Sequence, residues 1–70
     1  MNGVVESFNS HRGLGYIVAG DKQYLFHCAE IIDLTREIAV GAQVSFVEVL
    51  RFGNLEASEI IKLKVVRSRL

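Results

Sequence analysis

The chain has 70 residues, 50% of them hydrophobic, and its eight basic residues balance eight acidic ones. This length makes one small domain, and the hydrophobic content argues against disorder. The single cysteine, Cys28, excludes an internal disulfide and with it a disulfide-stapled secreted scaffold. We find no signal peptide and no apolar run long enough to span a bilayer. The sequence therefore predicts a cytoplasmic protein without a membrane partner.

Turn formers divide the chain into five short segments typical of β-strands. The third of these segments is rich in aromatic residues, and the alternating pattern of the fifth continues to about residue 66. In chain order, the predicted strands cover residues 3–9, 14–19, 23–28, 43–50 and 55–61.

The connection between the third and fourth strands is longer and its pattern is ambiguous. Ile31, Leu34 and Ile38 have the spacing of one helix face, but no clear cap accompanies them. We expect one short helical turn near residues 29–32, followed by an irregular loop. Five short strands so connected predict an all-β fold, a small closed five-stranded barrel of the oligonucleotide-binding type, the OB-fold. Closure also removes open edges that would make so apolar a sheet aggregate.

The charges are unevenly distributed along the chain. Residues 1–61 hold eight acidic and four basic residues, whereas residues 62–70 hold four basic residues and no acid. A basic tail on a mildly acidic body is suited to contact with phosphate, although a solvated, partly frayed end is the simpler explanation. The chain thus divides into a barrel domain over residues 1–61 and a basic C-terminal extension over residues 62–70.

Five short segments of the sequence carry a family resemblance. They are Gly3-x-Val5-x-x-Phe8-Asn9, Arg12-Gly13-Leu14-Gly15-Tyr16-Ile17, Phe26-His27 followed by Ile31, Gly41-x-x-Val44-x-Phe46, and Ala57-x-x-Ile60. In their order and spacing they resemble the cold-shock domain, over about residues 2–61. The resemblance implies a closed five-stranded antiparallel barrel that binds single-stranded RNA or DNA and needs no cofactor.

The outward face of the second and third strands is the candidate binding surface. Single strands are held by bases that stack on exposed side chains, beside a basic track for the backbone. Strand alternation directs Ile17, Tyr24 and Phe26 to the core. It leaves four side chains together outside, at the positions of the family's base-stacking platform: Leu14, Tyr16, Leu25 and His27.

This platform departs from the family pattern. Ser7, Leu14, Leu25 and Cys28 stand where the family favours an aromatic residue, and Glu6 stands where it favours lysine. Leucine packs against a base without the planar fit of an aromatic ring. We therefore expect single-strand binding to be weaker than in a full cold-shock protein.

Seven residues are predicted to bind nucleic acid, with three roles. Tyr16 and His27 stack against bases. Arg12, which stands where the family has lysine, and Arg51 neutralise phosphates. Leu14, Leu25 and Phe52 supply apolar contact. The alternative is a barrel whose exposed Leu14, Leu25 and Tyr16 form an apolar patch that binds another protein or a second copy of the chain as a homodimer.

No group of residues indicates catalysis, so we expect a non-enzyme. The stretch 13–15, Gly-Leu-Gly, is too short for a dinucleotide loop and leads into a strand. His27 and Cys28 are adjacent in a strand and so point to opposite faces, which prevents a nucleophile–base pair. One cysteine and two histidines make a poor zinc site, and the carboxylates form no identifiable acid–base pair.

Overall fold

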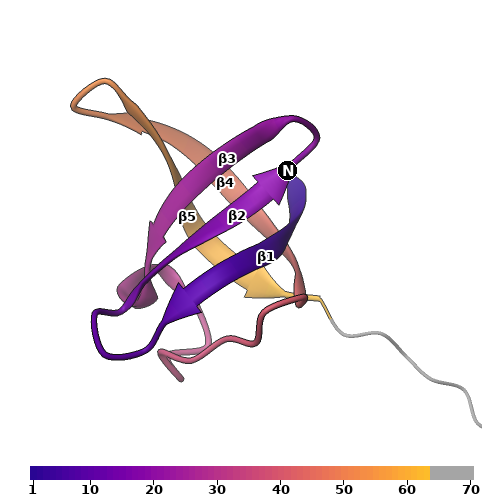
Figure 1. Cartoon of the computed structure of the whole chain (residues 1–70), viewed down its shortest axis with the longest axis vertical. Coiled ribbons are helices and arrows are strands. Elements are labelled where there is room, and N and C mark those ends of the chain that lie inside the picture. Colours follow the sequence, from indigo (N-terminus) through magenta and orange to yellow (C-terminus); the bar gives the residue numbers. More distant parts are fainter. Residues whose placement is uncertain (64–70) are drawn as a thin grey trace, which may run out of the picture.

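A computed structural model describes residues 1–63, which form a closed five-stranded barrel (Figure 1). The elements are β1 (Asn2–Asn9), β2 (Leu14–Ala19), β3 (Lys22–His27), the 3₁₀ turn η1 (Cys28–Glu30), β4 (Gln43–Arg51) and β5 (Asn54–Lys62). The all-β barrel expected from the sequence is confirmed, and each strand lies within one residue of its predicted bounds. The helical turn begins one residue earlier than expected. The predicted extension of the last strand towards residue 66 lies outside the described residues.

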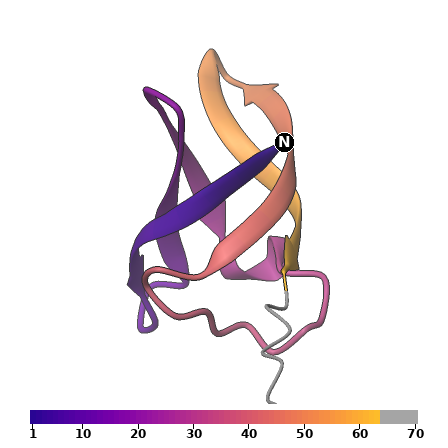
Figure 2. The same ribbon diagram turned by 90° about the vertical axis from the view of Figure 1, so that its right-hand side faces the viewer.

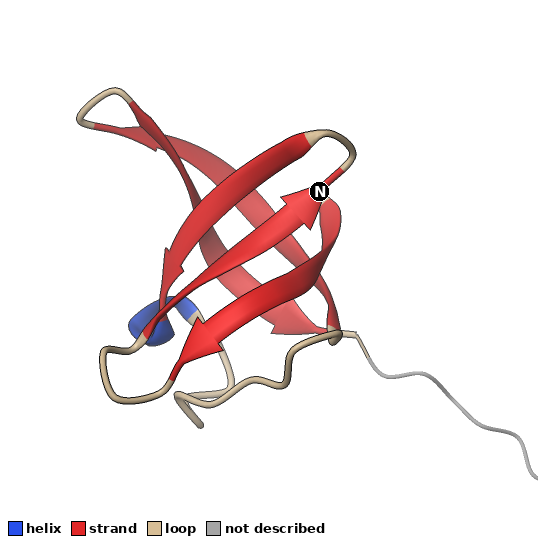
Figure 3. Ribbon diagram, in the orientation of Figure 1, coloured by secondary structure: helices blue, strands red, loops and turns tan. Residues whose placement is uncertain are grey.

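The strands follow one another around the barrel in the order β1-β2-β3-β5-β4. Four of the five strand pairs are antiparallel, and β3 meets β5 in parallel through the single pair Leu25–Glu56. The parallel contact follows from the long connection between β3 and β4, which carries the chain across one end of the barrel (Figure 3). Two turns, β2–β3 and β4–β5, project from the opposite end (Figure 2).

The core is built from the inward residues of all five strands, together with Ile31 and Ile38 from the connection between η1 and β4. Its largest fully buried side chains are Tyr24, Phe26, Ile17, Ile31, Ile60, Val5 and Val44. The predicted inward positions in β2 and β3 are therefore correct. The hydroxyl group of the buried Tyr24 donates to the sulfur of Met1 at 3.8 Å, so the one polar atom of this ring is not left without a partner.

Gly15 allows two aromatic rings to pack across β2. Phe8, Gly15 and Phe26 are neighbours on adjacent strands, and the two rings stack with their centroids 5.8 Å apart and their planes within 6°. A side chain on Gly15 would collide with the Phe26 ring and with the backbone oxygen of Ser7. Close packing, rather than a phosphate loop, thus accounts for this glycine.

The connection from η1 to β4 is irregular, as predicted. Ile31 and Ile38 are buried, but Leu34 is 77% exposed and has a φ of 65°, so the helix-like spacing of these three residues does not describe a common face. Near the end of the barrel, Lys62 forms an ion pair with Asp33 at 3.1 Å and donates to the Thr35 hydroxyl at 2.9 Å. These contacts tie the connection to the last residue of β5.

Candidate nucleic-acid interface

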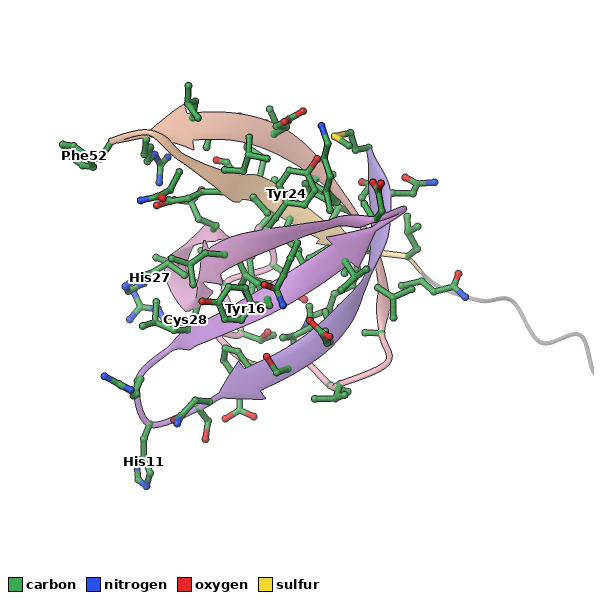
Figure 4. The ribbon with its side chains drawn as sticks, turned by 45° about the horizontal axis from the view of Figure 1, so that its top comes forward. His11, Tyr16, Tyr24, His27, Cys28 and Phe52 are labelled. Atoms are coloured by element: carbon green, nitrogen blue, oxygen red, sulfur yellow. The ribbon has the colours of Figure 1, made fainter. Side chains whose placement is uncertain are left out.

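The outward face of β2 and β3 brings four of the predicted residues together. Tyr16 lies directly opposite Leu25, and Leu14 lies opposite His27. Directly opposed side chains in antiparallel strands are about 5 Å apart at Cβ. Tyr16 and His27 are exposed, Tyr16 by 40%, whereas the two leucines are half-buried. Figure 4 shows Tyr16 and His27 on the same side of the molecule. The four side chains thus share one outward face, as strand alternation predicts, and we call these four residues the platform.

A shallow depression of about 320 Å³ opens beside the platform. It is lined by Ser7, Phe8, Asn9, Arg12, Leu14, Gly15, Tyr16 and Leu25. The Phe8 ring lies under it, packed against the core. The side-chain oxygen of Asn9 accepts a hydrogen bond from the backbone N–H of Arg12 at 3.1 Å, which holds the β1–β2 loop at the edge of the depression. Asn9 enters the sequence prediction only as part of the first family motif, and its part in placing Arg12 is new.

The two predicted phosphate contacts, Arg12 and Arg51, differ in their surroundings. Within residues 1–63, the Arg12 side chain makes no ion pair or hydrogen bond. The Arg51 guanidinium instead lies 3.3 Å from the Glu56 carboxylate and 3.9 Å from that of Glu30. Arg12 is therefore directly available to a ligand, whereas Arg51 is already held by two carboxylates.

Glu30 belongs to a small polar cluster beside the end of β3. The Ser58 hydroxyl donates to its carboxylate at 2.6 Å and the backbone N–H of Glu59 donates at 3.4 Å. The Ser58 hydrogen bond, with help from Glu59 and Arg51, lowers the pKa of the Glu30 carboxyl below its ordinary value of 4.5. This cluster joins η1 to β5, where the strands β3 and β5 share only one residue pair.

Phe52 lies away from the depression, at the tip of the β4–β5 hairpin (Figure 4). Its side chain is fully exposed, with a relative accessibility of 102%. Arg51 pairs with Asn54, so the turn has only two central residues, and both Phe52 and Gly53 have positive φ values, 51° and 79°. An aromatic residue is costly in this conformation, and no packing in the described chain accounts for it.

A polar bridge crosses the outward face close to Tyr16. The side-chain N–H of Gln23 on β3 donates to the carboxylate of Glu6 on β1 at 2.7 Å. Sequence reasoning missed Gln23 altogether. It identified Glu6 only as a departure from the family pattern, because the pairing of the two depends on the register of three strands.

Cys28 lies behind the platform rather than on it. Its sulfur is the atom nearest to where a side chain on Gly13 would extend, and the residue is half-buried. In residues 1–63, no three His, Cys, Asp or Glu side chains are grouped closely enough to hold a metal ion. No helix in this part of the chain is long and apolar enough to cross a membrane.

Comparison with known proteins decides the family. The model of the 'Cold-shock' DNA-binding domain matches residues 1–63. The chain belongs to the cold-shock domain family. Among solved structures, this cold-shock domain is similar to Drosophila Unr CSD456, with a TM-score of 0.77 and 24% sequence identity. The match covers 97% of this chain but only 28% of the Unr chain, and it shows the fold. No curated protein matches significantly.

Proposed function

We propose that this cold-shock domain binds single-stranded RNA or DNA by stacking bases on Tyr16 and His27. The observation that carries the proposal is the platform itself, where two exposed π-faced side chains stand on adjacent strands of one rigid barrel face. Arg12 at the edge of the adjoining depression supplies a cation for the phosphate backbone. Membership of a nucleic-acid-binding family supports the same assignment.

The expected affinity is modest, micromolar or weaker. Each base stacked on an aromatic side chain contributes about 1–3 kcal/mol, and the platform offers two such groups. Leu14 and Leu25 add apolar contact, but they are half-buried and aliphatic. Glu6, on the same face, adds a negative charge that opposes the approach of phosphate.

A titration of labelled single-stranded oligonucleotides of mixed sequence tests the proposal. Binding is expected at about 50 mM salt, in preference to duplex of the same sequence, and reduced at about 200 mM. The substitutions Tyr16→Ala and His27→Ala are each expected to weaken binding by about 1–3 kcal/mol with little change in stability, because both side chains face outward. Val47→Ala, on the exposed side of β4, is the matched control.

The outcomes of this titration separate three cases. Absence of binding at low salt contradicts the proposed function. Unfolding of either platform variant contradicts the assignment of its side chain to the surface. If Val47→Ala weakens single-strand binding as much as the platform variants do, the loss of affinity is not specific to the platform.

A second candidate function, self-association, is favoured by one feature. Leu50 and Phe52 on the β4–β5 hairpin are 69% and 102% exposed, and two such side chains suit a contact with another copy of the chain. A homodimer made in this way shows a concentration-dependent mass by analytical ultracentrifugation, and Leu50→Asp abolishes it. A monomeric mass at high concentration excludes it.

A further inference from the structure

The Glu6–Gln23 bridge joins two strands that are not neighbours. β1 and β3 lie on either side of β2, and adjacent strands are about 4.8 Å apart, so the two side chains span roughly 10 Å of barrel surface. Gln23 is paired with Val18, and Tyr16 is the next outward residue along β2. The bridge therefore crosses β2 between the positions of Val18 and Tyr16.

A β-bulge gives Glu6 this position. Val5 pairs with Ile17 and Ser7 pairs with Tyr16, so β1 has one residue more than β2 in this interval. The extra residue breaks the strict alternation of sides, and Glu6 and Ser7 are both exposed. Glu6 is thereby directed over the outward face at the level of Tyr16, while Val5 on one side of the bulge remains in the core.

The charge of Glu6 fixes how the Gln23 amide is turned. An ionised carboxylate only accepts hydrogen bonds, so the NH₂ group of Gln23 faces Glu6. One carboxylate oxygen takes the amide N–H, and the other oxygen of Glu6 remains as an acceptor on the outward face, one strand away from the position of Tyr16. In the described residues no cation forms an ion pair with Glu6, so its negative charge is retained at this edge.

We propose that the Glu6–Gln23 bridge selects the base that stacks on Tyr16, in favour of cytosine over uracil or thymine. The proposal rests on the proposed function, since it concerns the same stacked base. Cytosine carries an amino group at C4, and donation from this group to a Glu or Asp carboxylate is an established mode of base recognition. Uracil and thymine carry a carbonyl oxygen at the same carbon, which cannot donate and is repelled by the carboxylate.

Oligodeoxycytidine and oligodeoxyuridine are the probes that isolate this contact. The two bases differ only at C4 and N3, so their backbone charge and stacking area are alike. Oligomers of about seven nucleotides fall within the roughly 4–16 nucleotides that one OB-fold covers. By fluorescence anisotropy the wild-type domain is expected to bind the cytidine oligomer roughly fivefold more tightly, the lower end of the range for one well-placed base contact.

Glu6→Gln tests the residue responsible. The amide has nearly the shape of the carboxylate, but it can turn to donate to a carbonyl oxygen or to accept from an amino group. The preference is therefore expected to fall towards one, with the uridine oligomer gaining affinity. Glu48→Gln removes the same charge from an exposed position on β4. As the matched control, it is expected to shift both affinities equally and to keep their ratio.

The possible results distinguish this inference from the function on which it rests. If neither oligomer binds at low salt, the proposed function fails. If both bind with equal affinity to the wild-type domain, single-strand binding stands and the selection is refuted. A cytidine preference that persists in Glu6→Gln also refutes the selection, because another group then discriminates between the bases.

Discussion

The strained aromatic residue at the β4–β5 turn gives a prediction in which stability and binding change in opposite directions. Phe52 occupies the first of two positive-φ positions in a two-residue hairpin turn, a place where asparagine is strongly preferred. A left-handed conformation costs a residue with a bulky side chain about 1–2 kcal/mol. The ring is fully exposed, so its removal sacrifices no buried area.

Phe52→Asn is accordingly expected to raise the free energy of unfolding by about 1 kcal/mol. For a domain of this size such a gain raises Tm by roughly 4–8 °C. Thermal unfolding followed by circular dichroism measures the change. Phe52→Ala is the control that removes the ring but keeps an unfavourable residue at positive φ, and it is expected to leave Tm nearly unchanged.

The same variant is expected to weaken single-strand binding, since strain held at an exposed aromatic residue points to a contact made with a ligand. An Asn variant that is less stable than the wild type refutes the strain argument and means that the ring packs against the domain. An Asn variant that is more stable and binds as well as the wild type removes Phe52 from the predicted binding residues.

Two further predictions concern the carboxylates beside η1. Glu56→Gln leaves the Arg51 guanidinium with only its longer contact to Glu30. Single-strand affinity is therefore expected to rise, and the slope of the log binding constant against log salt concentration is expected to steepen by roughly 0.7. An unchanged slope shows that Arg51 contacts no phosphate. The Ser58 hydrogen bond lowers the pKa of Glu30, so the ionised form stabilises the fold. That contribution is present above the ordinary pKa of 4.5 and is lost as pH falls through the lowered value. As pH falls through this range, the free energy of unfolding is expected to decrease less in Glu30→Gln than in the wild type. An identical decrease in the variant and the wild type contradicts the assignment.

Much of the fold could be predicted because its signals are local. Alternation in β2 and β3 separated the buried Ile17 and Phe26 from the exposed Tyr16, and this needed no knowledge of the remaining chain. The turn formers likewise marked the strand ends to within two residues. The connection after η1 was harder, because the apolar spacing there reflects separate contacts of Ile31 and Ile38 with the core.

The electrostatic environment of the site could not be predicted, because it depends on register and closure. Glu30 and Glu56 are 26 positions apart in the sequence, yet both lie beside Arg51 once β3 and β5 meet. Gln23 reaches Glu6 only because β1 carries a bulge. A count of charges along the chain contains neither fact. The predicted contact of residues 62–70 with phosphate stays a prediction. Lys62 contacts the connection through Asp33, and residues 64–70 lie outside the described residues.

The arrangement of charges determines which force dominates binding by this domain. Of the five side-chain cations in residues 1–63, Arg51 and Lys62 are held by carboxylates, which leaves Arg12, Lys22 and Arg36 outside ion pairs. Only Arg12 among these three lines the depression beside the platform. Since each phosphate contact adds roughly 0.7 to the single-strand salt slope, the barrel alone contributes a shallow slope. If the domain binds single strands as proposed, its affinity is then expected to come chiefly from stacking on Tyr16 and His27. Salt dependence and aromatic substitution therefore measure two separable parts of the same interface.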